Sequence, residues 1–122
     1  WHLHTVGEYL LASDRPSPPW LVARGLAGWT GNIVESSVLH RLPAWLAAPL
    51  ALLPLAGWAG WKTPAGAFYA LLFAGYGVLF MIAGRDNNFY WAVVVMALWF
   101  VGYAFVPMAL RSLLASATPA RS

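Results

Sequence analysis

The chain has 122 residues, of which 61% are hydrophobic and only 9% are charged, with a formal net charge of +3. A soluble domain carries about 25% charged residues, so water is not the solvent for most of this surface, and the composition excludes a soluble enzyme. The Lys and Arg residues form no cluster, which excludes a nucleic-acid-binding face, and the absence of cysteine excludes disulfides, thiolate metal sites and thiol catalysis.

Residues 1–41 contain no apolar run of membrane-spanning length, and we expect them to form an amphipathic arm in the membrane interface. A short helix is predicted at the start, before a proline-rich elbow at residues 15–19. A second apolar stripe at helical spacing consists of Val22, Leu26, Trp29 and Ile33. The rings of Trp20 and Trp29 favour docking of this arm onto a partner subunit; packing on the chain's own spans is the other interpretation.

Three runs without charged residues follow, at residues 42–61, 66–84 and 89–110. At about 1.5 Å of rise per residue, either of the last two spans the roughly 30 Å hydrocarbon layer as a helix. The four polar residues 85–88 allow only a tight reversal, so these two helices should be antiparallel neighbours. The sequence predicts an all-α integral membrane protein with a three-helix transmembrane domain at 42–114 and a flexible tail at 115–122.

The first run contains two internal prolines, Pro49 and Pro54. Each proline removes one backbone hydrogen bond, which a membrane helix tolerates only where neighbouring groups satisfy the freed carbonyl. We therefore expect a kinked span, with a re-entrant or interfacial helix as the alternative.

Aromatic residues near the ends of the runs are predicted to act as membrane-interface anchors. These residues are Trp58, Trp61, Tyr90 and Trp91.

Two places carry candidate helix caps. Asn32 and Glu35 have capping-box spacing, which predicts a separate short helix from Ile33. Asp86 or Asn87 is predicted to cap the third span.

No ionisable side chain lies inside any run, which argues against transport by this chain alone. No catalytic or metal motif is present. His40 stands just before the first run, where a histidine in contact with water or lipid headgroups is one interpretation. Axial ligation of a haem or chlorophyll-type pigment is the other.

Three segments together suggest a family: Gly84-Arg85-Asp86-Asn87-Asn88-Phe89-Tyr90-Trp91, Gly102-Tyr103-Ala104-Phe105-Val106-Pro107 and Leu110-Arg111-Ser112-Leu113. Residues 40–114 thereby resemble the C-terminal membrane region of bacterial polyprenyl-phosphate-sugar glycosyltransferases of the protein mannosyltransferase type. The family's catalytic acids lie in an early loop that this chain lacks. The resemblance therefore implies a fragment or relic without transferase activity, and it assigns no functional residue.

The function that these features favour is that of a small non-catalytic accessory subunit in a larger bacterial membrane complex, respiratory or photosynthetic. Its expected partners are larger integral membrane subunits and lipids, and its expected location is a bacterial inner membrane, which it crosses several times. The glycosyltransferase fragment and a pigment or haem binder through His40 are the alternatives.

Overall fold

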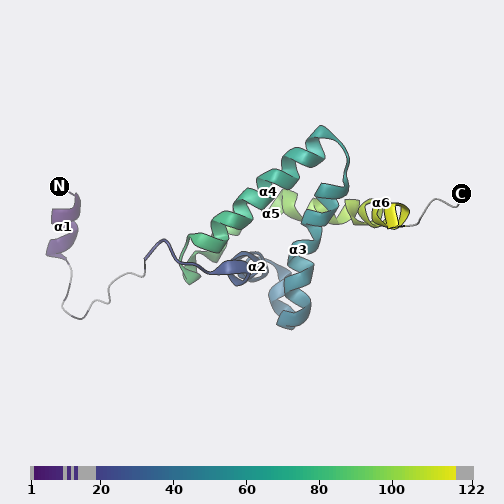
Figure 1. Ribbon diagram of the computed structural model, residues 1–122. Helices are drawn as coiled ribbons and strands as arrows, with labels where there is room; N and C mark the ends of the chain where they lie inside the picture. Colours follow the sequence, from purple (N-terminus) through teal and green to yellow (C-terminus); the bar gives the residue numbers. More distant parts are fainter. Residues whose placement is uncertain (1, 10, 12, 14–18, 118–122) are drawn as a thin grey trace, which may run out of the picture.

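The computed structural model describes residues 2–9, 11, 13 and 19–117, and the regular structure in these residues is helical apart from one isolated antiparallel bridge (Figure 1). The elements are α1 (His2–Glu8), α2 (Gly25–Glu35), η1 (Val38–Arg41), α3 (Ala44–Gly60), α4 (Pro64–Ile82), η2 (Asp86–Ala92), α5 (Val93–Trp99), η3 (Phe100–Phe105) and α6 (Val106–Ala117). The all-α prediction is confirmed. Residues 15–18 of the predicted elbow and 118–122 of the predicted tail lie outside the described residues, whereas residues 115–117 continue α6.

Two helical segments in the described part of the chain are long and apolar enough to cross a membrane. The first is α4, with 19 residues, and the second runs for 31 residues from Asn87 to Ala117 through η2, α5, η3 and α6. The helix α3 is also apolar but has only 17 residues.

The start of α4 is fixed by a side-chain cap. The Thr63 hydroxyl accepts a hydrogen bond from the amide of Gly66 at 3.1 Å, and Pro64 occupies a position where its missing N–H has no helical partner to lose. The chain leaves the far end of α4 through Gly84, whose φ of +94° disfavours residues with a side chain. The predicted second run is therefore shifted by two residues, from 66–84 to 64–82.

The helix α3 continues through both prolines. Pro54 cannot donate to the Leu50 carbonyl, four residues earlier, and the Tyr103 hydroxyl donates to that oxygen instead, at 2.7 Å. The Trp99 indole donates to the neighbouring Ala51 carbonyl at 2.9 Å. The expected compensation of a proline by neighbouring groups is thus present at Pro54.

Small residues allow α3 to pack closely against the last helical segment. A Cβ added at Gly57 would overlap the carbonyl oxygen of Gly102, and one added at Gly60 would overlap Ala109. The two segments therefore cross in close contact (Figure 1). This crossing explains why glycines occur in the middle of both helices.

The second and third predicted runs are not the close neighbours that the sequence predicts. The helix α4 packs mainly on α2 and α3, and it diverges from α5 and α6 to form a V in Figure 1. The reason is the bulk of the aromatic side chains between them: the rings of Phe73 and Trp99 meet edge to face with centroids 5.1 Å apart. The small residue Gly77 of α4 lies against Trp29 of α2 instead.

The segment before α2 is hydrogen bonded to the C-terminal end of α4. The amides of Val22 and Arg24 donate to the carbonyls of Ile82 and Met81, at 3.1 and 2.8 Å, and Gly84 donates to the Trp20 carbonyl at 2.8 Å. These bonds satisfy carbonyls that a helix end leaves without donors. The helix α2 itself packs on α3, α4 and η2, so the packing is continuous across the boundary predicted after residue 41.

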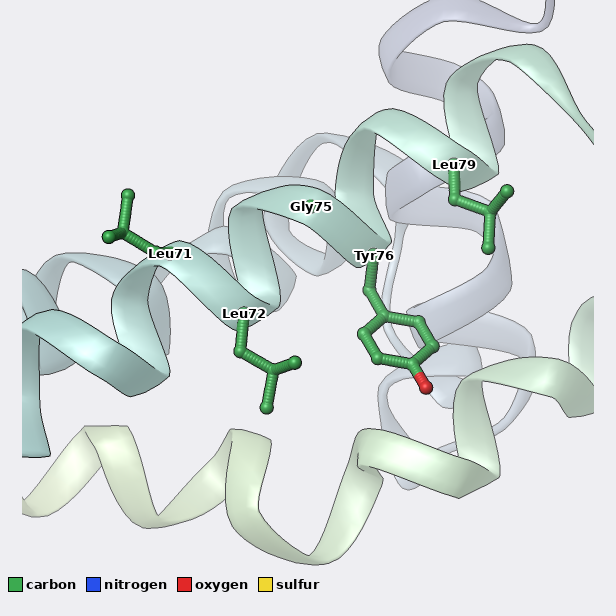
Figure 2. Close-up of a pocket in the computed structure, with 5 residues that line it drawn as sticks. All are labelled: Leu71, Leu72, Gly75, Tyr76 and Leu79. Atoms are coloured by element: carbon green, nitrogen blue, oxygen red, sulfur yellow. The ribbon is translucent and has the colours of Figure 1, made fainter.

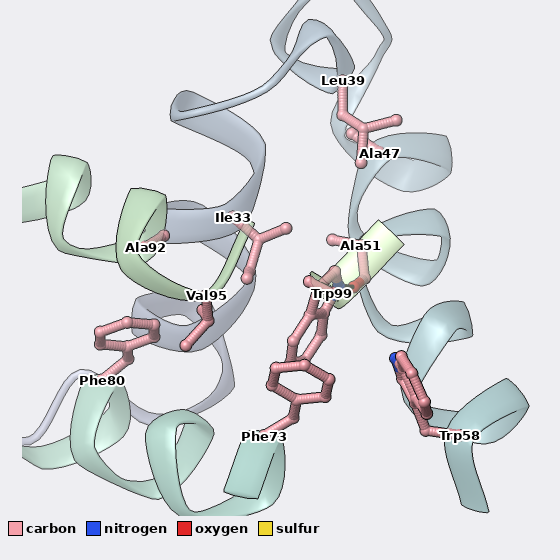
Figure 3. Close-up of a cluster of buried hydrophobic side chains, with 10 residues drawn as sticks. All are labelled: Ile33, Leu39, Ala47, Ala51, Trp58, Phe73, Phe80, Ala92, Val95 and Trp99. Carbon is pink, nitrogen blue, oxygen red and sulfur yellow. Dashed lines mark hydrogen bonds between the residues drawn. The ribbon is translucent and has the colours of Figure 1, made fainter. Parts of the chain in front are cut away.

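The core consists of side chains from most of these elements (Figure 3). Its buried members are Ile33, Leu39, Ala47, Ala51, Trp58, Phe73, Phe80, Ala92, Val95 and Trp99. Trp99 is the largest fully buried side chain. It joins α3 to α4, because its indole N–H bonds to Ala51 while its ring packs on Phe73.

Candidate functional site

The outer faces of α4 and of the last helical segment are apolar and exposed. Leu71 on α4 and Val94 on α5 are each 75% exposed. Other exposed apolar residues on these faces are Phe68, Val78, Ile82, Val93, Leu98 and Val101. Many large apolar side chains exposed on the same helices favour contact with lipid or with another protein over contact with water.

One groove of about 420 Å³ lies along α4 (Figure 2). Leu71, Leu72, Gly75, Tyr76 and Leu79 line it, and the side chains of Leu72 and Tyr76 extend towards the neighbouring helical ribbon in this view. The groove has no charged lining residue. A second groove, of about 430 Å³, lies between α3 and α6.

Trp20 lies in a stack of three planar groups at the turn after α4. Its ring is parallel to that of Trp91, with centroids 5.5 Å apart and an interplanar angle of 15°. The Arg85 guanidinium lies over the Trp20 ring, 4.3 Å from the centroid. A guanidinium at this distance is attracted by the electron-rich ring face. Trp20 remains 49% exposed, so part of its surface is accessible to a partner.

Trp29, the second predicted docking residue, packs inside the chain's own helices. Its ring lies against Gly77 and meets Trp99 edge to face, with centroids 6.2 Å apart. The buried Trp29 indole N–H has no hydrogen-bond acceptor among the described residues. In this position, little of the Trp29 side-chain surface is accessible to another subunit.

The predicted interfacial anchors lie in different surroundings. The prediction that Trp58 is an interfacial anchor is corrected by its position in the core. Trp58 is only 3% exposed, and its indole donates to the Leu98 carbonyl at 3.1 Å. Trp61 stacks on Phe105, whereas Tyr90 is exposed. Trp91 is half-buried in the stack with Trp20.

Sequence reasoning missed an exposed tryptophan in the first turn of α3. Trp45 is 77% exposed, and it follows the charged Arg41 by four residues. A tryptophan this close to the start of an apolar run is the ordinary signal of an interfacial anchor. That signal was present in the sequence.

The turn after α4 carries the two residues predicted to cap the third span, Asp86 and Asn87. The helix η2 begins at Asp86, so the N-cap position falls to Arg85, which makes no capping hydrogen bond. Asn87 therefore lies inside the helix and is exposed, and the side chain of Asp86 is not among those that the structure describes. Asn88 is buried instead, and its amide donates to the Tyr90 hydroxyl at 3.2 Å.

The separate helix predicted from Ile33 is also wrong, because α2 runs without interruption from Gly25 to Glu35. Asn32 lies within it and is 1% exposed. Its side-chain oxygen accepts a hydrogen bond from Arg24 at 3.1 Å, an interaction that sequence spacing alone did not reveal. This bond partly satisfies a polar group that would be costly to bury alone.

His40 is exposed at the end of η1. Its Nδ1 lies 2.5 Å from the Ser37 carbonyl oxygen. Because a carbonyl oxygen only accepts hydrogen bonds, Nδ1 donates in this arrangement, and in a neutral imidazole ring Nε2 then keeps a lone pair. The described residues contain no group of three or more His, Cys, Asp or Glu side chains that could hold a metal ion.

These features define a helical protein with two apolar segments of membrane-spanning length and exposed apolar faces. Comparisons with protein-family models, curated proteins and solved structures found no match. The resemblance to polyprenyl-phosphate-sugar glycosyltransferases therefore stays a prediction.

Proposed function

We propose that the chain is a multi-pass integral membrane protein with three spans, formed by α3, α4 and the segment from η2 to α6. The observation that carries this proposal is the exposed apolar surface of α4 and α5, which holds no charged residue. Replacing water by lipid around the exposed side chains of Leu71 and Val94 lowers the free energy by about 25 cal/mol per Å² of apolar surface.

The helix α3 is the shortest of the three spans. Its 17 residues give a length of about 25 Å, somewhat less than the roughly 30 Å hydrocarbon layer. Arg41 and Lys62 bracket it, which places a charged residue at each end of the apolar helix. Local thinning of the bilayer accommodates a short span at modest cost.

Within the membrane, we propose the role of a non-catalytic accessory subunit of a larger bacterial complex, respiratory or photosynthetic. Two surfaces support contact with larger subunits. The apolar faces of α4 and α5 offer helix-packing area, and the half-exposed ring of Trp20 lies at one end of α4, where an aromatic side chain suits an interface.

The test is purification of the tagged chain from its native membrane in mild detergent, followed by mass spectrometry and an absorption spectrum. We expect stoichiometric larger membrane subunits. Val94→Glu should release them, because it places a charge on the exposed face of α5. Val38→Glu is the control, on an exposed position of η1 outside the three proposed spans. Recovery of the chain alone would contradict the role, and recovery of a longer polypeptide that contains it would favour the glycosyltransferase alternative.

A second candidate function is axial ligation of a haem or chlorophyll-type pigment by His40. The hydrogen bond from Nδ1 to the Ser37 carbonyl supports it, since such a bond is the usual way a protein orients a ligating imidazole. The same absorption spectrum tests it. A pigment band should accompany the wild-type chain and vanish in His40→Ala, and a colourless wild-type preparation would contradict ligation.

A further inference from the structure

The groove between α3 and α6 combines an apolar hollow with a single cation. Ala56 and Ala59 are exposed on the α3 wall, and Lys62 lies just beyond the end of that helix. Ala109 and Ser112 of α6 form part of the opposite wall.

The hollow exists because the side chains that meet here are small. At Gly60 the two helices touch, and a Cβ on this glycine would overlap that of Ala109. Neighbouring alanines cover little of the space beyond this contact. The result is a groove with an apolar floor and with Lys62 among its lining residues.

We propose that this groove binds one anionic phospholipid, with an acyl chain along the floor and the phosphate at Lys62. This inference rests on the proposed membrane location. In that location Lys62 stands between two spans, at the depth of lipid headgroups, and its flexible side chain can reach a phosphate there. The hydroxyl of Ser112 supplies a neutral hydrogen-bonding group to the same headgroup region.

The groove suits a lipid better than a partner helix. Its α3 wall extends only from Ala56 to Lys62, which is roughly two helical turns. A transmembrane partner helix packs along a much longer stripe. Lys62 also gives this groove a charge that complements a phosphate, whereas the groove on α4 has no charged lining residue.

The experiment is native mass spectrometry of the full chain in detergent, with dioleoylphosphatidylglycerol or dioleoylphosphatidylcholine added. We expect the wild-type chain to retain the anionic lipid preferentially. Lys62→Gln should lower retention of the anionic lipid roughly fivefold, because one basic residue near a lipid surface contributes about that factor, and should leave the zwitterionic lipid unchanged. Lys62→Arg should keep the preference.

Two matched controls separate the groove from general effects. Arg111→Gln removes an exposed cation of α6 that does not line the groove, and it should leave retention unchanged. Ala59→Phe fills the groove and should lower retention of both lipids, whereas Ala97→Phe, at an exposed position of α5, should not. Circular dichroism verifies that all variants keep their helix content.

Equal effects of Lys62→Gln and Arg111→Gln would overturn the lipid site, as would a normal lipid pattern in Ala59→Phe. Loss of a co-purified protein from Ala59→Phe, with lipid retention intact, would assign the groove to a partner helix instead. Alkaline extraction of membranes distinguishes the two levels of the proposal. A chain that stays in the membrane but shows no lipid preference refutes only the lipid site, whereas a chain that is washed out refutes the membrane location as well.

Discussion

The Tyr103 hydroxyl donates a hydrogen bond to the Leu50 carbonyl, the acceptor that Pro54 leaves without a helical donor. A side chain from the last helical segment thus replaces a missing backbone bond of α3. The interaction links two segments that are distant in sequence, and it makes a proline acceptable inside an apolar helix.

Tyr103→Phe should lower the free energy of unfolding in detergent by about 1 kcal/mol, because it leaves the Leu50 carbonyl without a donor. Pro54→Ala restores a backbone N–H to that carbonyl. In the Pro54→Ala background, the additional effect of Tyr103→Phe should therefore fall close to zero. A double-mutant cycle measured by denaturant titration checks this, and equal effects in both backgrounds would contradict the proposed relationship.

Gly57→Ala should destabilise the protein by about 1–3 kcal/mol, since its new Cβ overlaps the Gly102 carbonyl oxygen and forces the helices apart. Gly75→Ala is the matched control on α4, where the added Cβ meets nothing within 4 Å. The control should be neutral or stabilising by roughly 0.5–1 kcal/mol, because alanine favours helix more than glycine does. Thermal unfolding of both variants in one detergent is the measurement; similar destabilisation by both would refute the close crossing.

Trp20→Ala should destabilise the turn after α4 by about 1–2 kcal/mol, through loss of the stacked ring and of the Arg85 contact. Trp45→Ala removes an equally large ring that is 77% exposed, and its effect in detergent should stay within about 0.5 kcal/mol. Denaturant titration of the two variants decides the matter. The stack has no energetic importance if the two losses are equal.

The absence of native cysteine allows a direct test of three spans. Single cysteines at Arg41, Lys62 and Asn87 should react with a membrane-impermeant maleimide so that positions 41 and 87 share one side and position 62 lies on the other. The reason is that α3 and α4 each cross once between these positions. If α3 is a re-entrant or interfacial helix, the cysteine at 62 would label from the same side as that at 41.

Hydropathy and turn residues were enough to predict the helical class and the approximate ends of α4. They were not enough to predict which face of each helix is buried. In an amphipathic helix the polar face identifies the outside, but α3 and α4 are apolar all round, so no periodicity distinguishes the buried Trp58 from an exposed anchor. The same limitation concealed the close contact of Trp29 with Gly77.

Contacts between segments that are distant in sequence were the second feature that could not be predicted. Nothing local to Asn32 shows that Arg24 reaches it, and nothing local to Gly102 shows that its partner is α3 rather than α4. By contrast, the consequence of a proline in a helix is local. For that reason the need for an outside donor near Pro54 could be predicted, although the identity of the donor, Tyr103, could not.

The hydrogen bonds between residues 20–24 and the end of α4 have a consequence for biosynthesis. The donors at Val22 and Arg24 are synthesised about 60 residues before their acceptors at Ile82 and Met81. At roughly 5–20 residues per second, this delay lasts on the order of seconds. During that interval α2 lacks its place against α4, so the N-terminal part of the chain completes its assembly only after α4 has been synthesised.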